Sequence, residues 1–576
     1  MFELTTSESE EPFKGTVPGN QWPRIPVQAL SDFEPSLRVA VVVPFFEDPE
    51  ALELTLIGLA HQTYPSSLME VVVADDGSEP PFQVPADHNG LQIRGVRQER
   101  DGFGLARARN LGARSNDADI LVFLDADMVP VPEFVAAHAR WHHLIPDGMV
   151  VGFRKHVDFE AIGPKAVRKA LAEHGSLDGL FRDRLITTPE WIERHIERTG
   201  NLTSEHDDLY RVASGGNLSL RREFYLQLGG NDESFTEYGG EDNEFAYRAL
   251  LAGAVIIPER AALAWHQGAG GWQQDDDGSG RRLTHINLQQ RISEQSLRHS
   301  RPGRGYLVPH VGVVVHVRDE PVEQVILVVE SILGNWFHDL HIEVRCHFVR
   351  PDSVLLAREF EFDPRVTIVD PNGPPIKDVA AVQMTVPLSA VLGPRTVDKV
   401  LAELQHGGPG ALHLTVPQLS PSDGLVEVTQ RRSVQRALRH VGALGSLPDA
   451  LATLFGERWM PGGDFEIERY EAGNALAVWT PPGERTVIVR PTMEIDENKV
   501  TQLAKRLQRT ESDLSNHRRR KVVRFMNLVG AVTRMKGVRA AARKLTAPAE
   551  EVRDLEVIED ELRSLIRRSP EDIQPE

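Results

Sequence analysis

Short apolar runs alternate with helical patterns over the first half of the chain. Residues 39–43, 71–74 and 120–124 are runs of four or five apolar residues, which is typical of strands buried on both faces. An Asp-Pro-Glu sequence at 48–50, followed by apolar residues at helical spacing up to Ala60, predicts a helix after the first run. This alternation predicts an α/β fold with a mostly parallel sheet, whose ligands bind beyond the carboxyl ends of the strands.

Changes in composition divide the chain into four parts. Residues 1–37 are polar and rich in proline, which indicates an arm. Residues 38–285 hold the first α/β domain, including a charged insertion at 155–210. Residues 306–495 predict a second α/β domain, and residues 496–576 predict a basic, amphipathic, helical C-terminal region.

An internal repeat supports the second domain. Shifting the sequence by 272 residues places residues 41–43 on residues 313–315. The acids at 75–76 then fall on residues 347–348, which are His and Phe. We therefore expect a degenerate copy of the first domain that keeps its strands and loses its acids, although the few identities leave a chance match open.

The composition is that of a folded chain without a membrane span. Of 576 residues, 41% are hydrophobic and 26% are charged, and no run approaches the roughly 18 apolar residues that cross a bilayer. The net charge of -20 argues against a general nucleic-acid binder. Acidic residues near Met1, where a secretory signal has a basic segment, predict a cytoplasmic protein. The single cysteine, Cys346, excludes an intrachain disulfide and a multi-cysteine metal site.

The C-terminal region has the opposite charge. From Lys505 to Lys544 there are 13 Lys or Arg residues against two acids, beside apolar residues at 522–532. Such a helix can rest on the inner face of an anionic membrane, where each basic residue contributes about 1 kcal/mol. It can equally pack on its own protein or on a second copy in a homo-oligomer. Peripheral membrane contact through residues 505–545 and protein contact therefore both stay open.

Four aspartates fall at the predicted carboxyl edge of the first sheet. Asp75 and Asp76 end one apolar run, and Asp125 and Asp127 end another. Carboxylates at such an edge can hold a divalent cation against a diphosphate. Oxygen ligands without a thiolate favour Mn²⁺ or Mg²⁺, and an imidazole from His266 favours Mn²⁺ of the two.

A second acid cluster lies at a predicted helix start. Glu241 and Asp242 follow Gly239 and Gly240 and open a helical pattern. A carboxylate in this position can accept a proton from an attacking hydroxyl, although acids are also good residues for capping a helix. Together the two clusters suggest metal-dependent group transfer from a nucleotide-linked donor.

With these residues the sequence resembles the family-two inverting glycosyltransferases, which have a GT-A fold. The resemblance covers roughly residues 38–270. It rests on five segments in the order of the family, namely residues 41–47, 73–78, 106–112, 124–127 and 238–245. The last segment is similar to the Trp-Gly-Gly-Glu-Asp stretch of β-1,4-galactosyltransferases and of chondroitin-polymerase-like bacterial enzymes, with Tyr238 in place of the Trp.

The resemblance implies a role for each candidate residue. Asp127 would be the direct metal ligand, Asp125 would contact the ribose or a metal-bound water, and His266 would complete the metal site. Asp242 would be the general base, and Glu241 would bind the acceptor. The other nucleotide-binding candidates are Pro44, Glu47, Asp75, Asp76, Arg107 and Arg109, and the acceptor side comprises Tyr238, Gly239, Gly240 and Glu241.

For two pairs of these candidates, a structural role is an alternative to nucleotide binding. A guanidinium offers a bidentate fork to a diphosphate or to a carboxylate, so Arg107 and Arg109 either bind the nucleotide or lock an acid in place. Asp75 and Asp76 either hold the base and ribose or stabilise an Asp-Gly turn.

The implied function is inverting transfer of a hexose, N-acetylhexosamine or uronic acid. The donor would be a nucleotide sugar, most simply UDP-linked, and the acceptor a saccharide or lipid-linked molecule in the synthesis of a cell-surface polysaccharide or glycolipid. A sugar-nucleotide nucleotidyltransferase is one alternative, but it calls for a Gly-rich basic loop where this chain has Pro-Phe-Phe-Glu-Asp at 44–48. A non-catalytic glycosyltransferase-like scaffold is the other, and it suits residues 306–420 better than the first domain.

Overall fold

The computed structural model describes residues 16–471 except 87–89, 205–207, 269–278, 299–303, 348–350, 373–378 and 406. The predicted helical C-terminal region, with its segment 505–545, lies outside the described residues. The chain divides into two compact units. One comprises Met1–Glu320 and Val328–Arg469, and the other comprises Pro321–Leu327 and Tyr470–Glu576.

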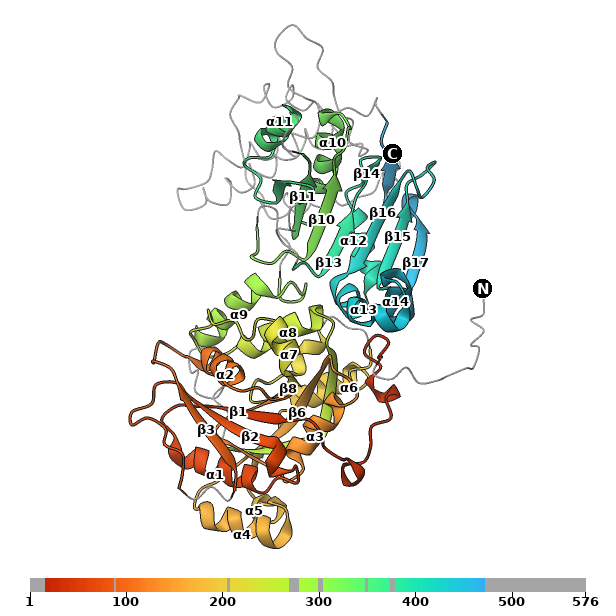
Figure 1. Cartoon of the computed structure of the whole chain (residues 1–576). Helices are drawn as coiled ribbons and strands as arrows, with labels where there is room; N and C mark the ends of the chain where they lie inside the picture. Colours follow the sequence, from red (N-terminus) through yellow and green to blue (C-terminus); the bar gives the residue numbers. More distant parts are fainter. Residues whose placement is uncertain are drawn as a thin grey trace, which may run out of the picture. The chain divides into compact units, whose positions relative to one another are not determined.

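The first sheet is parallel in one half and mixed in the other (Figure 1). Its strands are β1 Val39–Phe45, β2 Met69–Asp75, β3 Gln92–Arg97, β4 Ile120–Leu124, β5 Met128–Pro130, β6 Gly148–Val157, β7 Leu185–Thr187, β8 Asn217–Arg221 and β9 Val255–Gln267. They run in the order β3-β2-β1-β4-β8-β6-β9-β5, with β7 paired to β6. Strands β3, β2, β1 and β4 pair in parallel, as predicted, whereas β8 is antiparallel to both β4 and β6.

Helices cover both faces of the parallel half. Those of the first domain are α1 Pro49–Ala60, α2 Leu105–Arg114, α3 Phe134–His142, α4 Pro164–His174, α5 Asp178–Phe181, α6 Glu190–Arg198, α7 Arg222–Gln227, α8 Glu241–Leu251 and α9 Ser279–Arg291. Val41 of β1 shares a buried cluster with Leu52 of α1, while Val42 shares another with Ala113 of α2. The predicted strand buried on both faces and the helix after it are thus confirmed. The predicted start of the insertion at residue 155 is wrong, because β6 continues to Val157 before α4 begins.

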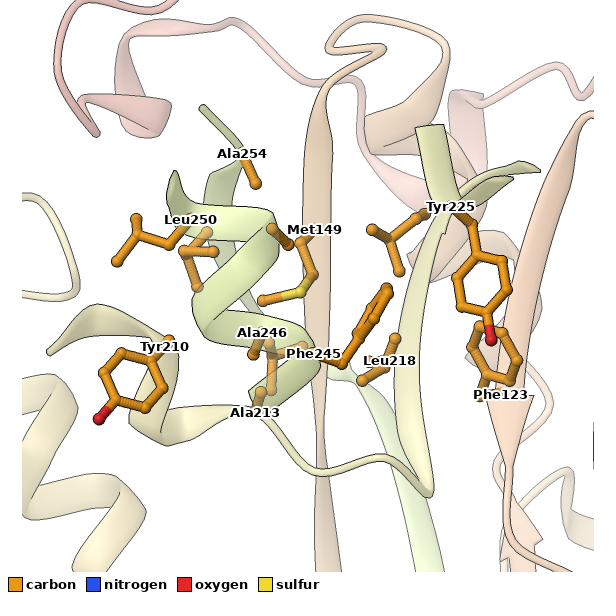
Figure 2. Close-up of a cluster of buried hydrophobic side chains, with 14 of the residues drawn as sticks. Phe123, Met149, Tyr210, Ala213, Leu218, Tyr225, Phe245, Ala246, Leu250 and Ala254 are labelled. Carbon is orange, nitrogen blue, oxygen red and sulfur yellow. The ribbon is translucent and has the colours of Figure 1, made fainter. Parts of the chain in front are cut away.

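Helix α8 packs its apolar face on the sheet, which determines where its N-terminus lies (Figure 2). Phe245 and Leu250 of α8 lie in one buried cluster with Leu218 of β8 and Met149 of β6. Full burial of a side chain such as Phe contributes roughly 1.5–3 kcal/mol. Since α8 begins at Glu241, this packing holds the predicted acid pair beside the sheet.

The second sheet repeats the topology of the first. Its strands are β10 Val311–His316, β11 Leu340–Arg345, β12 Val366–Val369, β13 Val382–Thr385, β15 Ala411–Thr415, β16 Leu425–Gln430 and β17 Glu457–Pro461. The order β12-β11-β10-β13-β16-β15-β17 matches β3-β2-β1-β4-β8-β6-β9, and each pair has the same parallel or antiparallel sense. The accompanying elements are α10 Val322–Leu333, α11 Pro351–Glu359, α12 Thr396–Leu404, α13 Arg431–Leu444, α14 Leu447–Phe455 and the pair β14 Ala390–Leu392 with β18 Ile467–Arg469.

The repeat keeps the fold and loses the acids. Strand β1 begins at Val39 and β10 at Val311, which is the predicted offset of 272 residues. Strand β4 is followed by Asp-Ala-Asp, whereas β13 is followed by Val-Pro-Leu-Ser at 386–389. The predicted fold class, a GT-A-like domain followed by a second α/β domain, is confirmed. The exact limits of the domains stay a prediction.

Within the described ranges, no helix is long and apolar enough to cross a bilayer.

Candidate active site

The turn after β4 carries Asp125 and Asp127 to the carboxyl edge of the sheet. The backbone N–H of Asp125 donates to the carbonyl of Gly216 at 3.2 Å, and that of Met128 donates to the carbonyl of Asp125 at 3.1 Å. Strand β5 then runs antiparallel to β9, with Met128 opposite His266. As a result, Oδ2 of Asp127 lies 3.4 Å from Nε2 of His266.

The charges around Asp127 and His266 suit a divalent cation. The side chain of Asp127 is 40% exposed. Desolvation of its carboxyl group by the surrounding protein, followed by the negative charge of Asp125, nevertheless raises its pKa to about 7. Burial and, next, the positive charge of Arg154 lower the pKa of His266, so its imidazole is neutral at pH 7. A carboxylate that is costly to ionise beside a neutral imidazole is a suitable donor pair for Mn²⁺ or Mg²⁺.

The protein supplies only part of a coordination shell. In the described part of the chain, no group of three or more His, Cys, Asp or Glu residues is arranged to hold a metal ion. Magnesium in particular is commonly held by one or two carboxylates together with substrate phosphates and waters. The donor set at Asp127 and His266 therefore fits a cation whose remaining ligands come from a bound diphosphate and water.

Arg109 of α2 connects the two acid clusters. Its side chain is only 3% exposed, with Nη2 3.0 Å from Oδ1 of Asp125 and Nη1 2.9 Å from Oε1 of Glu241. Burial alone would lower the pKa of Arg109, but the carboxylates of Asp125 and Glu241 raise it. Of the two interpretations open for Arg109, this geometry matches the locking of acids, and its contact with a nucleotide stays a prediction.

Arg107 lies on the same helix but has a different partner. Its Nη2 donates to the backbone carbonyl of Asp101 at 2.9 Å, and its Nη1 lies 3.7 Å from the carboxylate of that residue. Its role toward a nucleotide also stays a prediction.

A glycine pair makes room for these ion pairs. A Cβ atom at Gly215 would lie 2.4 Å from Nη1 of Arg109, and one at Gly216 would lie 1.9 Å from Oδ2 of Asp125. The N–H of Gly215 donates to Oδ2 of Asp242 at 3.2 Å. The Gly-rich turn before β8 therefore contacts both acid clusters, and a side chain at either glycine would displace a charged group.

The start of α8 orients Asp242. Gly239 and Gly240 have φ angles of 94° and 95°, in the left-handed region that glycine adopts without strain. Oδ1 of Asp242 accepts a hydrogen bond from the backbone N–H of Asn243 at 2.8 Å. Together with the N–H of Gly215, this contact holds the carboxylate of Asp242 by two backbone donors.

Glu241 is the more deeply buried of the pair. Burial and then the neighbouring charge of Asp242 raise its pKa to about 7, against the opposing influence of Arg109. One oxygen of Glu241 pairs with Arg109, while its Oε2 has no hydrogen-bond partner among the described residues. This oxygen is a free acceptor beside Asp242.

Tyr238 lies next to both clusters. It is 56% exposed, and its ring meets that of Phe103 edge-on with 5.5 Å between centroids. Burial of the hydroxyl end, followed by the charges of Asp125 and Glu241, raises its pKa, so the phenol stays neutral. An exposed aromatic ring beside an acid pair can contact the apolar face of a sugar.

Asp75 and Asp76 are engaged by their own surroundings. Oδ1 of Asp75 accepts from the N–H of Ser78 at 2.8 Å, and Oδ2 of Asp76 accepts from the N–H of Gly104 at 3.0 Å and pairs with Arg100. The contact of Asp75 matches the stabilisation of the Asp-Gly turn, whereas those of Asp76 join this turn to the segment before α2. A carboxylate has about four lone-pair sites, so contact with a nucleotide stays open for both residues.

Pro44 and Glu47 lie at the end of β1. Pro44 pairs with Ala74 in the parallel register, and Glu47 is exposed with a φ angle of 50°. The N–H of Glu47 donates to Oγ of Ser78 at 3.0 Å, which connects this turn to the one that carries Asp75 and Asp76. Both stay nucleotide-binding predictions.

Two polar residues of the site were not predicted. Arg154 of β6 donates a hydrogen bond to Oγ of Ser214, and the ring of His156 lies 4.3 Å from that of His266 between centroids. The sequence does hold a signal for these two residues, because Arg154 and His156 are two positions apart and therefore lie on the same face of a strand. The predicted insertion boundary at 155 concealed it.

Comparison with known proteins finds similarity to two family models within the first domain. Residues 40–202 match the family described as Glycosyl transferase family 2, and residues 201–260 match the N-terminal domain of galactosyltransferase. Chondroitin synthase of Escherichia coli is 29% identical over 276 residues, which cover 44% of this chain and 38% of that protein. Hyaluronan synthase of Pasteurella multocida is 31% identical over 252 residues, 42% of this chain and 25% of that protein.

A third relative, validoxylamine A glucosyltransferase of Streptomyces hygroscopicus subsp. limoneus, is 33% identical over 234 residues, 38% of this chain and 50% of that protein. The chain thus spans half or less of the length of each of these relatives. The matches confirm the resemblance drawn from the motifs.

We predict that Glu241 makes stability fall as the pH rises. Because its folded-state pKa is raised from 4.5 to about 7, the protonated form is favoured on folding, and this contribution is lost between about pH 4.5 and 7. Urea unfolding at pH 5, 6, 7 and 8 measures the free energy of unfolding of Glu241→Gln and of the wild type. The value for Glu241→Gln minus that for the wild type should increase from pH 5 to pH 7 and stay constant above pH 7. Parallel curves for the two proteins at all four pH values would contradict the prediction.

Proposed function

We propose, on the premise that residues 40–202 form a glycosyl transferase family 2 domain, that this chain is a metal-dependent inverting glycosyltransferase. It transfers a sugar from a nucleoside diphosphate donor, most simply UDP-linked, to a saccharide or lipid-linked acceptor. The observation that carries the proposal is the Arg109 bridge between Asp125 and Glu241. It supports a site in which the acids for the donor and the acids for the acceptor face one reacting sugar.

The donor side must offset the charge of a diphosphate. A protein with a net charge of -20 repels such a ligand unless the site supplies positive charge locally. Asp127 and His266 would hold Mn²⁺ or Mg²⁺, with Asp125 beside them. When bound, the cation supplies a positive charge that stabilises the departing diphosphate.

The acceptor side must remove a proton. Asp242 takes the proton of the acceptor hydroxyl as the hydroxyl oxygen bonds to the anomeric carbon and the bond from that carbon to the diphosphate oxygen breaks. Attack from the face opposite the diphosphate inverts the anomeric configuration. The backbone N–H groups of Gly215 and Asn243 orient the carboxylate for this step. We assign acceptor binding to Glu241 and to the exposed ring of Tyr238.

The relatives support a carbohydrate product. Two of them are named as synthases of chondroitin and hyaluronan, and the third as a glucosyltransferase. We therefore place the transfer in the synthesis of a cell-surface polysaccharide or glycolipid. In the described part of the second domain, β13 is followed by 386–389 without an acid, so we assign donor binding to the first domain.

The direct experiment is a panel of nucleotide sugars incubated with the full chain and Mn²⁺. We expect release of the nucleoside diphosphate from one donor, most simply a UDP-sugar, and loss of that release when a chelator is added. Turnover that persists in chelator would remove Asp127 and His266 from the metal role. Absence of binding and hydrolysis for every donor would contradict the proposed function itself.

We predict that Asp242→Asn lowers kcat by roughly 10² to 10⁴ while the dissociation constant of the donor stays within about twofold. Asparagine keeps the size of the side chain but cannot accept the proton, and its single oxygen can accept from only one of the two backbone N–H groups that hold Asp242. Asp117→Asn is the matched control, because Asp117 is a surface carboxylate that is 86% exposed and pairs with Arg38. Steady-state kinetics and calorimetry of the donor separate the two effects. Wild-type turnover in Asp242→Asn would refute the assignment.

A further inference from the structure

We infer that Arg154 is a donor-binding residue that contacts the diphosphate of the nucleotide sugar and holds it as it leaves. The inference rests on the proposed function and deepens it by naming the positively charged side chain of the diphosphate subsite. Three observations support the inference: the position of Arg154 in β6, the hydrogen bond of its guanidinium to Ser214, and the N–H donors of the guanidinium that have no partner in the described part of the chain.

The register of the sheet places Arg154 on the face that carries the metal site. Strands β6 and β9 pair with Arg154 opposite Ala264 and His156 opposite His266. Side chains two residues apart in a strand point to the same face, so Arg154 and His156 share one face. The rings of His156 and His266 lie 4.3 Å apart between centroids, which identifies that face as the one where His266 meets Asp127.

The partner of the guanidinium fixes it beside both acid clusters. Nη1 of Arg154 donates a hydrogen bond to Oγ of Ser214. Ser214 directly precedes Gly215, whose N–H binds Asp242, and Gly216, whose carbonyl accepts from the N–H of Asp125. Arg154 therefore lies at the point where the donor acids and the acceptor acid meet.

Arg154 has hydrogen-bonding capacity to spare. A guanidinium has five N–H donors, and the one acceptor that Arg154 meets in the described chain is the neutral hydroxyl of Ser214. Its Nε is buried and has no hydrogen-bond partner there. Burial of a donor without a partner is unfavourable, and the guanidinium as a whole keeps N–H donors for a ligand oxygen.

Arg109 shows the contrast. Both of its terminal nitrogens face carboxylates of the protein, so its charge is already compensated. The charge of Arg154 is not paired in this way and is available to a phosphate, which guanidinium groups bind through two parallel hydrogen bonds. As the bond from the anomeric carbon to the diphosphate breaks, negative charge grows on the diphosphate oxygens, and a fixed cation there favours the step.

The test compares ligands with and without the diphosphate. Calorimetry with Mn²⁺ present would measure the dissociation constants of UDP and uridine for the wild type, Arg154→Gln and Arg154→Lys. If the donor panel selects another base, the corresponding nucleoside diphosphate and nucleoside replace them. We expect Arg154→Gln to bind UDP 10- to 100-fold more weakly with uridine affinity unchanged, and Arg154→Lys to recover part of the loss.

A control variant and the remaining outcomes keep the inference separate from the proposed function. Arg260→Gln removes an arginine of the adjacent strand β9 that is 58% exposed and pairs with Glu193, and it should bind both ligands as the wild type does. Equal UDP affinity in Arg154→Gln and the wild type would overturn the inference and leave the function standing. Parallel weakening of UDP and uridine would also overturn it, because that pattern indicates a structural role. A wild-type protein that binds no nucleoside diphosphate would contradict the proposed function itself.

Discussion

One buried ion bridge holds the site together. Arg109 lies between Asp125, which follows β4, and Glu241, which begins α8, so three segments distant in the sequence meet at a single guanidinium. Removing one partner of a buried ion pair typically costs about 3–5 kcal/mol, because the remaining charge is left uncompensated. The bridge brings the acid cluster after β4 and the acid cluster at the start of α8 to one place.

The rest of the first domain supports that bridge. The apolar face of α8 is packed on β6 and β8 through residues such as Phe245, so the N-terminus of the helix cannot move far from the sheet. The glycines at 215–216 let Arg109 and Asp125 approach the turn before β8. The short strand β5 returns the chain to β9 and brings Asp127 to His266. Packing, backbone shape and charge thus converge on the same few side chains.

Part of this arrangement could be predicted from the sequence. Apolar runs that end in acids predicted parallel strands with Asp125 and Asp127 at their carboxyl edge, because side-chain burial on both faces leaves a continuous apolar pattern. The 272-residue offset predicted the start of the second sheet, because β1, β2 and β3 begin at residues 39, 69 and 92 and β10, β11 and β12 begin at residues 311, 340 and 366, close to that offset in each case. The helix start at Glu241 was visible because two glycines precede a helical pattern.

Other features depend on contacts between segments that are distant in the sequence, and a local sequence pattern does not predict such contacts. The mixed half of the first sheet was not predicted, because the order of β8, β6 and β9 is set by long-range contacts. For the same reason Arg154 was missed, since its approach to Ser214 depends on how β6 lies beside β8 and β9. The sequence could not decide whether Arg109 binds a nucleotide or an acid of the protein, because its two carboxylate partners are distant from it in the sequence. The membrane prediction for residues 505–545 stays a prediction, because that segment lies outside the described residues.

The most direct test of this account is a crystal structure of the chain with Mn²⁺ and UDP, recorded at a wavelength where manganese scatters anomalously. The account predicts an anomalous peak beside Asp127 and His266, with the diphosphate next to it and the carboxylate of Asp242 on the side where the sugar would lie. A peak at another place, or a diphosphate bound away from Asp242, would contradict the claim that one site unites the two acid clusters.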